Sequence, residues 1–359
     1  FRARVGDDLT IRGTICAPGG GTLLVAGAVY RLEVENRGAE RHDVVVSLAG
    51  TWRWSLRTVR TSRPLEARNR LVGASDGAGL VLVAGGEPSL ASLAILGGAG
   101  ATIAASSGTD EPRDLGPGAT IAAENGTPIR FRVATRLELG PRQRGVAEFH
   151  IAAAVERDGA EARARTLQRV GGAELVRAAR LELARMQRRV RDVALGAILN
   201  RNLLFNAFYA VARAIDDDRV YPIVSRAPDC PPGPVFRERD ALAWSLPALL
   251  VTDSALAREV LLRALEQFSH QPVAELHYLY GWLLSPSFSL DGFCAYALAI
   301  DRYTRETGDE SILDEPIVGE VLRDLDDLIL DRLHPELLLA TTEILASGEL
   351  ATHPYVTYD

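Results

Sequence analysis

The chain has 359 residues, a net charge of −7, and 47% hydrophobic and 24% charged residues, which is ordinary for a globular protein of about two domains. The acidic balance argues against nucleic-acid binding, which depends on neutralising phosphates, and against attraction to anionic membranes. No apolar run reaches membrane-spanning length. The three cysteines (Cys16, Cys230 and Cys294) are scattered and show no metal-ligand spacing, so we expect free thiols, no metal site and a cytoplasmic location.

Residues 1–157 have the pattern of an antiparallel β-sandwich, because many short strands alternate with Gly-rich turns and show no helical period. Trp52, Trp54 and Leu56 share one face of an alternating segment. These tryptophans are either a platform for a sugar or packing in the core or between domains. Strands are also expected at Tyr30–Val34, Val44–Leu48, Leu80–Val83, Ile129–Val133 and Val146–Ala154.

Two Gly-containing stretches in this region resemble functional motifs. The run from Gly73 through Ser75 to Gly77 matches the nucleophile elbow of serine hydrolases, but a strand pattern follows it where that motif needs a helix, so we interpret it as a hairpin turn. The glycines near 97–100 lack the third glycine and the following helix of a dinucleotide site. Neither stretch predicts function.

Residues 158–197 are expected to form a linker helix. From Val176 to Ala197 apolar residues recur at alternating steps of three and four, which is typical of one long amphipathic helix, and arginines fill its solvated faces. A second helix is expected over Leu203–Ile215. Asn200, Asn202 and Asn206 lie near its expected start, where capping explains one of them at most.

Residues 198–359 are expected to be an all-helical catalytic domain, because no β pattern separates its amphipathic segments. One further helix is expected to be capped by Asp253 or Ser254 and to continue to Phe268, the next to cover Phe293–Tyr303, and a third Val318–Ile329. Pro247 should end or kink the helix that begins at Ala241.

Two loops in this half each carry aromatic residues and a carboxylate at a helix entrance, which is the composition of a polar, ring-lined cleft suited to a sugar. The first loop leads to Arg239 and Asp240, with Trp244 four residues on. The second leads to Asp291. Its aromatic and polar residues are His277, Tyr278, Tyr280 and Trp282.

Arg239 and Asp240 can bracket vicinal hydroxyls of a sugar, since the guanidinium donates hydrogen bonds and the carboxylate accepts them. A buried ion pair that holds the loop against a helix end is the alternative. Asp291 is either a helix N-cap or a general acid whose pKa is raised by burial among aromatic side chains. His277 is either a structural hydrogen-bonding residue or part of the cleft.

Three segments carry a resemblance to a known family: Phe236–Pro247 (Phe-Arg-Glu-Arg-Asp-Ala-Leu-Ala-Trp-Ser-Leu-Pro), Phe288–Tyr296 and Tyr303–Asp309. Together with the order of sandwich, linker helix and helical domain, they resemble the glycogen-debranching, amylo-α-1,6-glucosidase-like relatives of the (α/α)6-barrel glycoside hydrolases. The resemblance implies an α-helical toroid in which Arg239 and Asp240 bind hydroxyls of the terminal sugar. It implies that Asp291 is the general acid.

The function expected from this resemblance is a glycoside hydrolase that cleaves an α-linked glucoside or small oligosaccharide. The mechanism would be inverting, without a cofactor, and with a water held between two carboxyl groups. Asp291 would be catalytic, and the substrate-binding residues would be Arg239, Asp240, Trp244, His277, Tyr280 and Trp282. A carbohydrate phosphorylase of similar architecture and a sugar-binding or assembly protein without catalysis are the alternatives.

The number of helices leads to a further expectation. A closed toroid of this type has twelve helices, and residues 198–359 have room for about half of them at roughly 25–30 residues for each helix with its loop. We therefore expect the catalytic domain to be incomplete in this chain. A complementary segment or chain would complete the barrel and would carry the general base.

Overall fold

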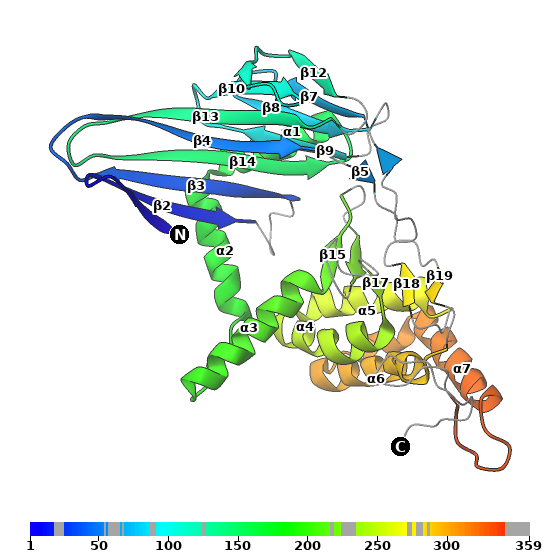
Figure 1. Ribbon diagram of the computed structural model, residues 1–359. Helices are drawn as coiled ribbons and strands as arrows, with labels where there is room; N and C mark the ends of the chain where they lie inside the picture. The colour runs from blue at the N-terminus through cyan, green and yellow to red at the C-terminus, as the bar shows by residue number, and fades with distance from the viewer. Residues whose placement is uncertain are drawn as a thin grey trace. The chain divides into compact units, whose positions relative to one another are not determined.

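The computed structural model describes residues 1–17, 25–53, 55–56, 65–66, 68–85, 91–123, 127–215, 219–223, 235–270, 275–277, 283–285 and 288–341. The chain divides into two compact units, Phe1–Glu182 and Leu183–Asp359 (Figure 1). No helix in the described part of the chain is both long enough and apolar enough to cross a membrane.

The first unit contains two antiparallel sheets, which confirms the predicted sandwich. The larger sheet has eight strands, in the order β1 (Arg2–Val5), β2 (Leu9–Cys16), β3 (Gly27–Asn36), β14 (Arg144–Ala154), β9 (Ala91–Leu96), β8 (Gly79–Ala84), β7 (Asn69–Gly73) and β12 (Thr120–Ala123). The smaller sheet has the order β11 (Arg113–Asp114), β10 (Thr102–Ser107), β13 (Ile129–Leu139) and β4 (His42–Trp52). A short pair, β5 (Ser55–Leu56) and β6 (Leu65–Glu66), follows β4 in sequence.

The core of this unit has two layers, because the larger sheet is covered on both faces. On β8, Leu80 and Leu82 belong to the cluster shared with the smaller sheet, whereas Val81 and Val83 pack with the helix α1 (Arg157–Val170). A strand buried on both faces has a continuous apolar sequence, and all six residues of β8 are buried. Trp52 packs at the edge of the inter-sheet cluster, in agreement with the core interpretation, while Trp54 lies outside the described residues.

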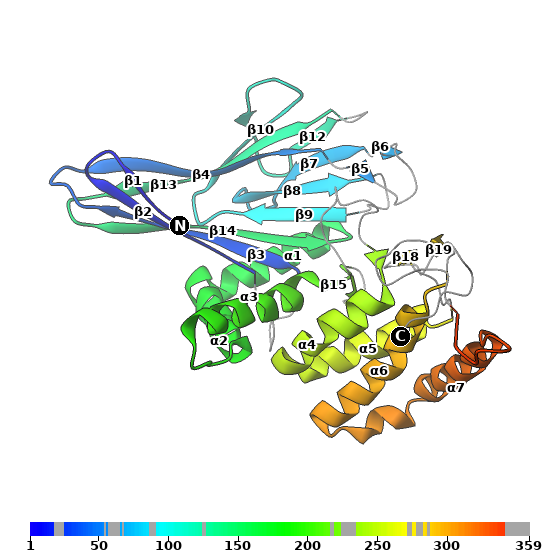
Figure 2. The ribbon, with the colours of Figure 1, turned by 60° about the horizontal axis from the view of Figure 1, so that its bottom comes forward.

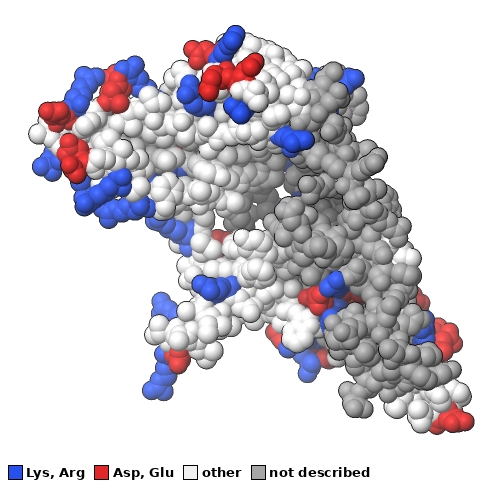
Figure 3. All heavy atoms as spheres, in the orientation of Figure 1, with Lys and Arg blue, Asp and Glu red and all other residues white. Residues whose placement is uncertain are grey.

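The surface of this unit carries charges of both signs next to one another, as Figure 3 shows. Arg136 on β13 pairs with Asp43 on β4, and Arg41 pairs with Glu138. Glu148 on β14 accepts hydrogen bonds from Arg31 at 2.9 Å and from the backbone amide of Gly172 at 3.0 Å. The last contact ties the start of the next helix to the sheet.

The single linker helix expected over residues 158–197 is wrong. Three helices cover this region: α1, α2 (Gly172–Met186) and α3 (Val193–Tyr209). The first break is at Gly171. Its φ is 84°, a backbone conformation that favours glycine. At the second break, Asn200 bonds to both the amide and the carbonyl of Arg188, and Asp192 caps α3 by accepting from the Leu195 amide.

The second unit is mainly helical, but the expectation that it is all-helical is wrong. The helix expected over Leu203–Ile215 is shorter than predicted, because α3 ends at Tyr209 and the residues that follow form a strand. The described strands are β15 (Val211–Arg213) paired with β16 (Val220–Pro222), and β17 (Val235–Phe236), β18 (Glu275–His277) and β19 (Leu283–Ser285) in one small sheet. The helices after α3 are the π-helix η1 (Arg239–Ser245), α4 (Leu246–Thr252), α5 (Ser254–Phe268), α6 (Leu290–Thr307), the short 3-10 helix η2 (Glu310–Asp314) and α7 (Pro316–Asp331).

The three later helices expected from the sequence are confirmed. Asp253 caps α5 by accepting from the Leu256 amide, and Gly308 in the left-handed conformation ends α6. Figure 2 shows α4, α5 and α6 lying side by side, and their apolar faces form one core with the apolar face of α7. Pro247 lies in the first turn of α4, where the wider π-helix changes to an α-helix, as its helix-breaking character predicts.

Candidate active site

The two segments that bear the predicted site residues are held in place by an aromatic stack and a helix cap. Phe236 on β17 stacks on Phe268 of α5, with ring centroids 3.9 Å apart, which fixes the chain just before η1 begins. Ser289 caps α6, so the capping role considered for Asp291 belongs to Ser289 instead. Both η1 and α6 therefore begin at well-defined points.

Arg239 brings the two predicted carboxylates together. Its Nη1 donates to Oδ2 of Asp291 at 2.9 Å, and its Nε lies 3.5 Å from Oδ1 of Asp240. Each of the three side chains is about a quarter to a third exposed. The guanidinium pairs more closely with Asp291 than with its sequence neighbour, so the ion pair of the alternative interpretation exists mainly between η1 and α6.

Asp291 lies in polar surroundings. Its Oδ1 accepts from the hydroxyl of Ser289 at 2.6 Å and from the amide of Gly292 at 2.9 Å, while Oδ2 accepts from Arg239. Three donors thus contact this carboxylate, and one of them is an amide in the first turn of α6, where backbone N–H groups have no partner within the helix. The aromatic enclosure expected around Asp291 is not what the described residues provide.

Glu238 is a deeply buried carboxyl group beside the Arg239–Asp291 contact, and sequence reasoning missed it. Only 2% of its surface is exposed, and its Oε1 has no hydrogen-bond partner. Burial raises the pKa of Glu238 to about 8, and the nearby carboxylates of Asp291 and Asp240 act in the same direction. A signal for its burial was present, since Phe236 and Glu238 alternate with Arg237 and Arg239.

Residues in the first two turns of α6 pack beside Glu238. A Cβ on residue 292 would lie 3.3 Å from Oε2 of Glu238 and 2.9 Å from Oγ of Ser289, so glycine leaves the room that these groups use. Tyr296 lies one turn further on, is fully buried, and has a hydroxyl with no partner. Burial and the nearness of Glu238 raise the pKa of Tyr296 well above its usual value.

The remaining predicted site residues are only partly described. Trp244 lies on η1, four residues beyond Asp240, and is 71% exposed, which leaves its ring face available to a ligand. His277 lies on β18, but its side chain is outside the described residues, as are Tyr280 and Trp282 entirely. The contribution of these three residues stays a prediction.

The chemistry of this cluster is acid–base and hydrogen-bonding chemistry. Arg239 offers donors and Asp240 and Asp291 offer acceptors at one place, and Glu238 keeps its proton at neutral pH. Burial, followed by the charge of Asp291, raises the pKa of the Cys294 thiol, which disfavours a thiolate nucleophile. Among the described residues, no group of three or more His, Cys, Asp or Glu side chains is placed to hold a metal ion.

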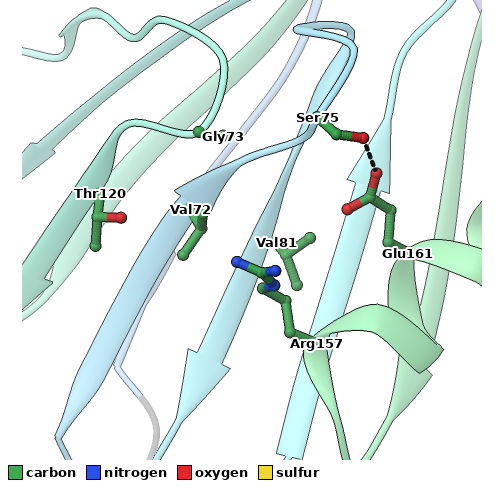
Figure 4. A pocket seen from close by; sticks show the side chains of 8 residues that line it. Val72, Gly73, Ser75, Val81, Thr120, Arg157 and Glu161 are labelled. Carbon is green, nitrogen blue, oxygen red and sulfur yellow. Dashed lines mark hydrogen bonds between the residues drawn. The ribbon is translucent and has the colours of Figure 1, made fainter.

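A separate cavity of about 220 Å³ lies in the first unit (Figure 4). Ser75, from the elbow-like Gly73–Gly77 run, donates to Glu161 of α1 at 2.9 Å, and β8 follows instead of a helix, which confirms the hairpin interpretation. The cavity is smaller than the roughly 300–1,000 Å³ typical of small-molecule sites. Its lining residues are Val72, Gly73, Ser75, Val81, Gly118, Thr120, Arg157 and Glu161.

Comparisons with known proteins show the fold. No protein-family model matches the chain, and no curated protein does. A human-microbiome protein assigned as a kojibiose phosphorylase has a solved structure with a TM-score of 0.53 and 11% identity, over 92% of this chain and 44% of its own. The chain thus spans less than half the length of that protein.

Two mannosidases of Bacteroides thetaiotaomicron also align, but with lower scores. A family GH92 inverting mannosidase has a TM-score of 0.40 and 11% identity, over 99% of this chain and 55% of its own. A family GH92 α-mannosidase has a TM-score of 0.42 and 9% identity, over 96% and 52%. The predicted fold class, an antiparallel sandwich followed by helices, is confirmed by the structure itself.

Proposed function

We propose that this chain is part of a carbohydrate-active enzyme, namely a glycoside hydrolase that cleaves an α-linked glucoside or small oligosaccharide with inversion. The observation that carries the proposal is the junction of η1 and α6, where Arg239 contacts both Asp240 and Asp291. Donors and acceptors so close together match the alternating hydrogen-bonding groups of vicinal sugar hydroxyls. The exposed ring of Trp244 supports the proposal as a stacking surface.

In this proposal Asp240 and Arg239 bind hydroxyls of the terminal sugar, and Asp291 protonates the leaving oxygen. Sugar hydroxyls would take over the guanidinium of Arg239, which leaves Asp291 free to hold a proton. Glu238 does not serve as the general base, because a carboxyl that keeps its proton at neutral pH cannot activate water. The proposal therefore places the base outside the residues that the structure describes, as in the debranching-type toroid that the sequence resembles.

The test uses the full chain and an α-linked glucose disaccharide, whose leaving oxygen is a poor leaving group unless it is protonated. Asp291→Asn should lower glucose release by at least about 100-fold, since general acid catalysis contributes roughly 10²- to 10⁴-fold. Asp324→Asn, an exposed carboxylate on α7, is the matched control and should leave turnover unchanged. Proton NMR of the sugar released first should show the inverted anomer. Normal turnover by Asp291→Asn would remove Asp291 from the mechanism.

Phosphorolysis is the second candidate, and the similarity to a protein assigned as a kojibiose phosphorylase favours it. Inorganic phosphate would then replace water as the nucleophile. The same assay with a disaccharide such as kojibiose, with and without phosphate, separates the two. Release of a sugar phosphate that depends on added phosphate supports the phosphorylase, whereas free glucose alone supports the hydrolase. Sugar binding without turnover would support the non-catalytic alternative.

A further inference from the structure

The sequence neighbours of Arg239 and Asp291 also pack against each other. Glu238 precedes Arg239, and Gly292 follows Asp291. Oε2 of Glu238 lies only 3.3 Å from the position that a Cβ on residue 292 would take. The partly exposed ion pair between Arg239 and Asp291 is therefore next to a buried region where the side chain of Glu238 lies against the backbone of α6.

We infer that Glu238 is a positioning residue of the candidate site. Its side chain packs against Gly292 and thereby fixes the position of Asp291 relative to Arg239. This inference deepens the proposed function, because it rests on that function for what Asp291 and Arg239 do. The buried carboxyl replaces the volume that an ordinary side chain at position 292 would occupy. A change in its size moves the first turn of α6, and with it Asp291.

The charge of Glu238 adds a second constraint on the same contact. Among the described residues, the titratable or charged groups in this cluster are Arg237, Arg239 and Asp240 around the start of η1 and Asp291, Cys294 and Tyr296 on α6. While Glu238 keeps its proton, Arg239 contacts both Asp291 and Asp240, and Arg237 lies 3.8 Å from Asp240. When Glu238 ionises, a third negative charge joins the cluster, and this buried charge has no hydrogen bond at Oε1. Loss of the proton therefore favours opening of the first turn of α6.

The direction of the pH effect follows from linkage. Burial raises the pKa of Glu238 to about 8 from its ordinary value of 4.5, so the closed state binds a proton that an open state releases. Closure is therefore most favourable below pH 4.5 and weakens by up to about tenfold for each pH unit until pH 8. A glutamine at this position has the same shape and cannot ionise, so it removes the pH effect but keeps the packing.

Amide hydrogen exchange read by mass spectrometry on peptides from residues 289–296 tests the inference in the full chain. At pH 6, Glu238→Gln should exchange no faster than wild type, and Glu238→Ala should exchange at least about tenfold faster. Between pH 6 and pH 8, the exchange of wild type relative to Glu238→Gln at the same pH should rise by up to about 100-fold. Comparison at matched pH cancels the intrinsic pH dependence of exchange.

Two results would overturn the inference: a ratio of wild type to Glu238→Gln that stays constant with pH, or a Glu238→Gln protein as unprotected as Glu238→Ala at pH 6. Exchange does not require a sugar, so it separates this inference from the proposed function. A measurement of affinity for methyl α-D-glucopyranoside then connects the role of Glu238 with the proposed function. The affinity should fall from pH 6 to pH 8 in wild type but not in Glu238→Gln, and an equal fall in both proteins would overturn the role of Glu238 in the site.

Discussion

Nη1 of Arg239 donates to Oδ2 of Asp291 at 2.9 Å, and this bond joins two residues that are 52 positions apart in sequence. The same guanidinium also approaches Asp240, at 3.5 Å. One side chain thus connects the two carboxylates that the sequence placed at separate helix entrances. Substitution of Arg239 therefore tests whether these two carboxylates act as one site.

Arg239→Lys should weaken sugar binding although it keeps the charge. An ammonium is a point donor and cannot reproduce the planar fork that faces two carboxylates at once. We expect roughly a tenfold higher Kd for methyl α-D-glucopyranoside by titration calorimetry, in line with the loss of one hydrogen bond to a charged group. Arg323→Lys, on the exposed face of α7, is the control. An unchanged Kd in Arg239→Lys would contradict the assignment.

Trp244→Ala should lower sugar affinity without a cost in stability. The indole is 71% exposed, so little buried apolar area is lost with it. Loss of a stacking surface typically costs about 0.5–1.5 kcal/mol, which corresponds to a two- to twelvefold weaker affinity. Titration calorimetry and thermal unfolding measure the two effects separately. A fall in Tm with unchanged affinity would show that Trp244 is structural.

Glu238→Gln should flatten the pH dependence of stability. The folded-state pKa of Glu238 is about 8 against an ordinary value of 4.5, so its contribution to stability is fully present below pH 4.5 and is lost as the pH rises to 8. The slope for one such group is roughly 1.4 kcal/mol per pH unit, which amounts to a few kcal/mol over this window. Chemical denaturation at pH 5, 6.5 and 8 should show wild type losing stability relative to Glu238→Gln. Parallel curves would mean that Glu238 is ionised in the folded state.

Gly292→Ala should destabilise the protein, although alanine usually favours helices. The added Cβ would lie 2.9 Å from Oγ of Ser289, which caps α6, and 3.3 Å from Glu238. Overpacking of this kind costs about 1–3 kcal/mol. Gly319→Ala on α7 is the matched control, because its Cβ would meet nothing closer than 3.6 Å, and it should stabilise by up to about 1 kcal/mol. Equal effects of the two substitutions would refute the steric argument.

Asn200→Ala should destabilise the turn between α2 and α3. The Asn200 side chain accepts from the Arg188 amide at 2.7 Å and donates to the Arg188 carbonyl at 2.9 Å, so alanine leaves two partly buried backbone groups without partners. The expected cost is about 1–3 kcal/mol by chemical denaturation. Arg201→Ala, at an exposed neighbouring position, should change stability by less than about 0.5 kcal/mol. A similar small effect for Asn200→Ala would show that the turn does not depend on this side chain.

The parts of the fold that the sequence could predict are those with a local cause. The strand pattern at Leu80–Val83, the cap at Asp253 or Ser254 and the helix over Phe293–Tyr303 depend on neighbouring residues, and all three are confirmed. The break between α2 and α3 was missed because the apolar steps of three and four continue across it. Its cause is the Asn200 side chain, which reaches back twelve residues.

The candidate site shows the same division. The positions of Arg239, Asp240 and Asp291 at helix entrances predict that they belong to one site, and the structure brings these three together. Glu238 was missed because a charged residue between two arginines suggests a solvated surface. Its burial depends on space left by Gly292, which is 54 residues away in the chain, and on Phe268, which anchors the preceding strand. The alternation of Phe236 and Glu238 with the two arginines is a local signal for this burial, but the partners that make the space come from distant parts of the chain.

The π-helical turn η1 has a consequence for sequence length. The amide of Leu246 bonds to the carbonyl of Ala241, five residues back, so this turn contains one residue more than an α-helical turn would. A π-helical turn takes up its extra residue by turning less per residue, so deletion of a single residue between Ala241 and Ser245 would leave Arg239 at about the same angle relative to α4. The same deletion inside the regular helix α4 would instead turn the residues before it by about 100° relative to those after it. The π-helical turn is therefore the place where the chain can change its length by one residue and still point the guanidinium at Asp291.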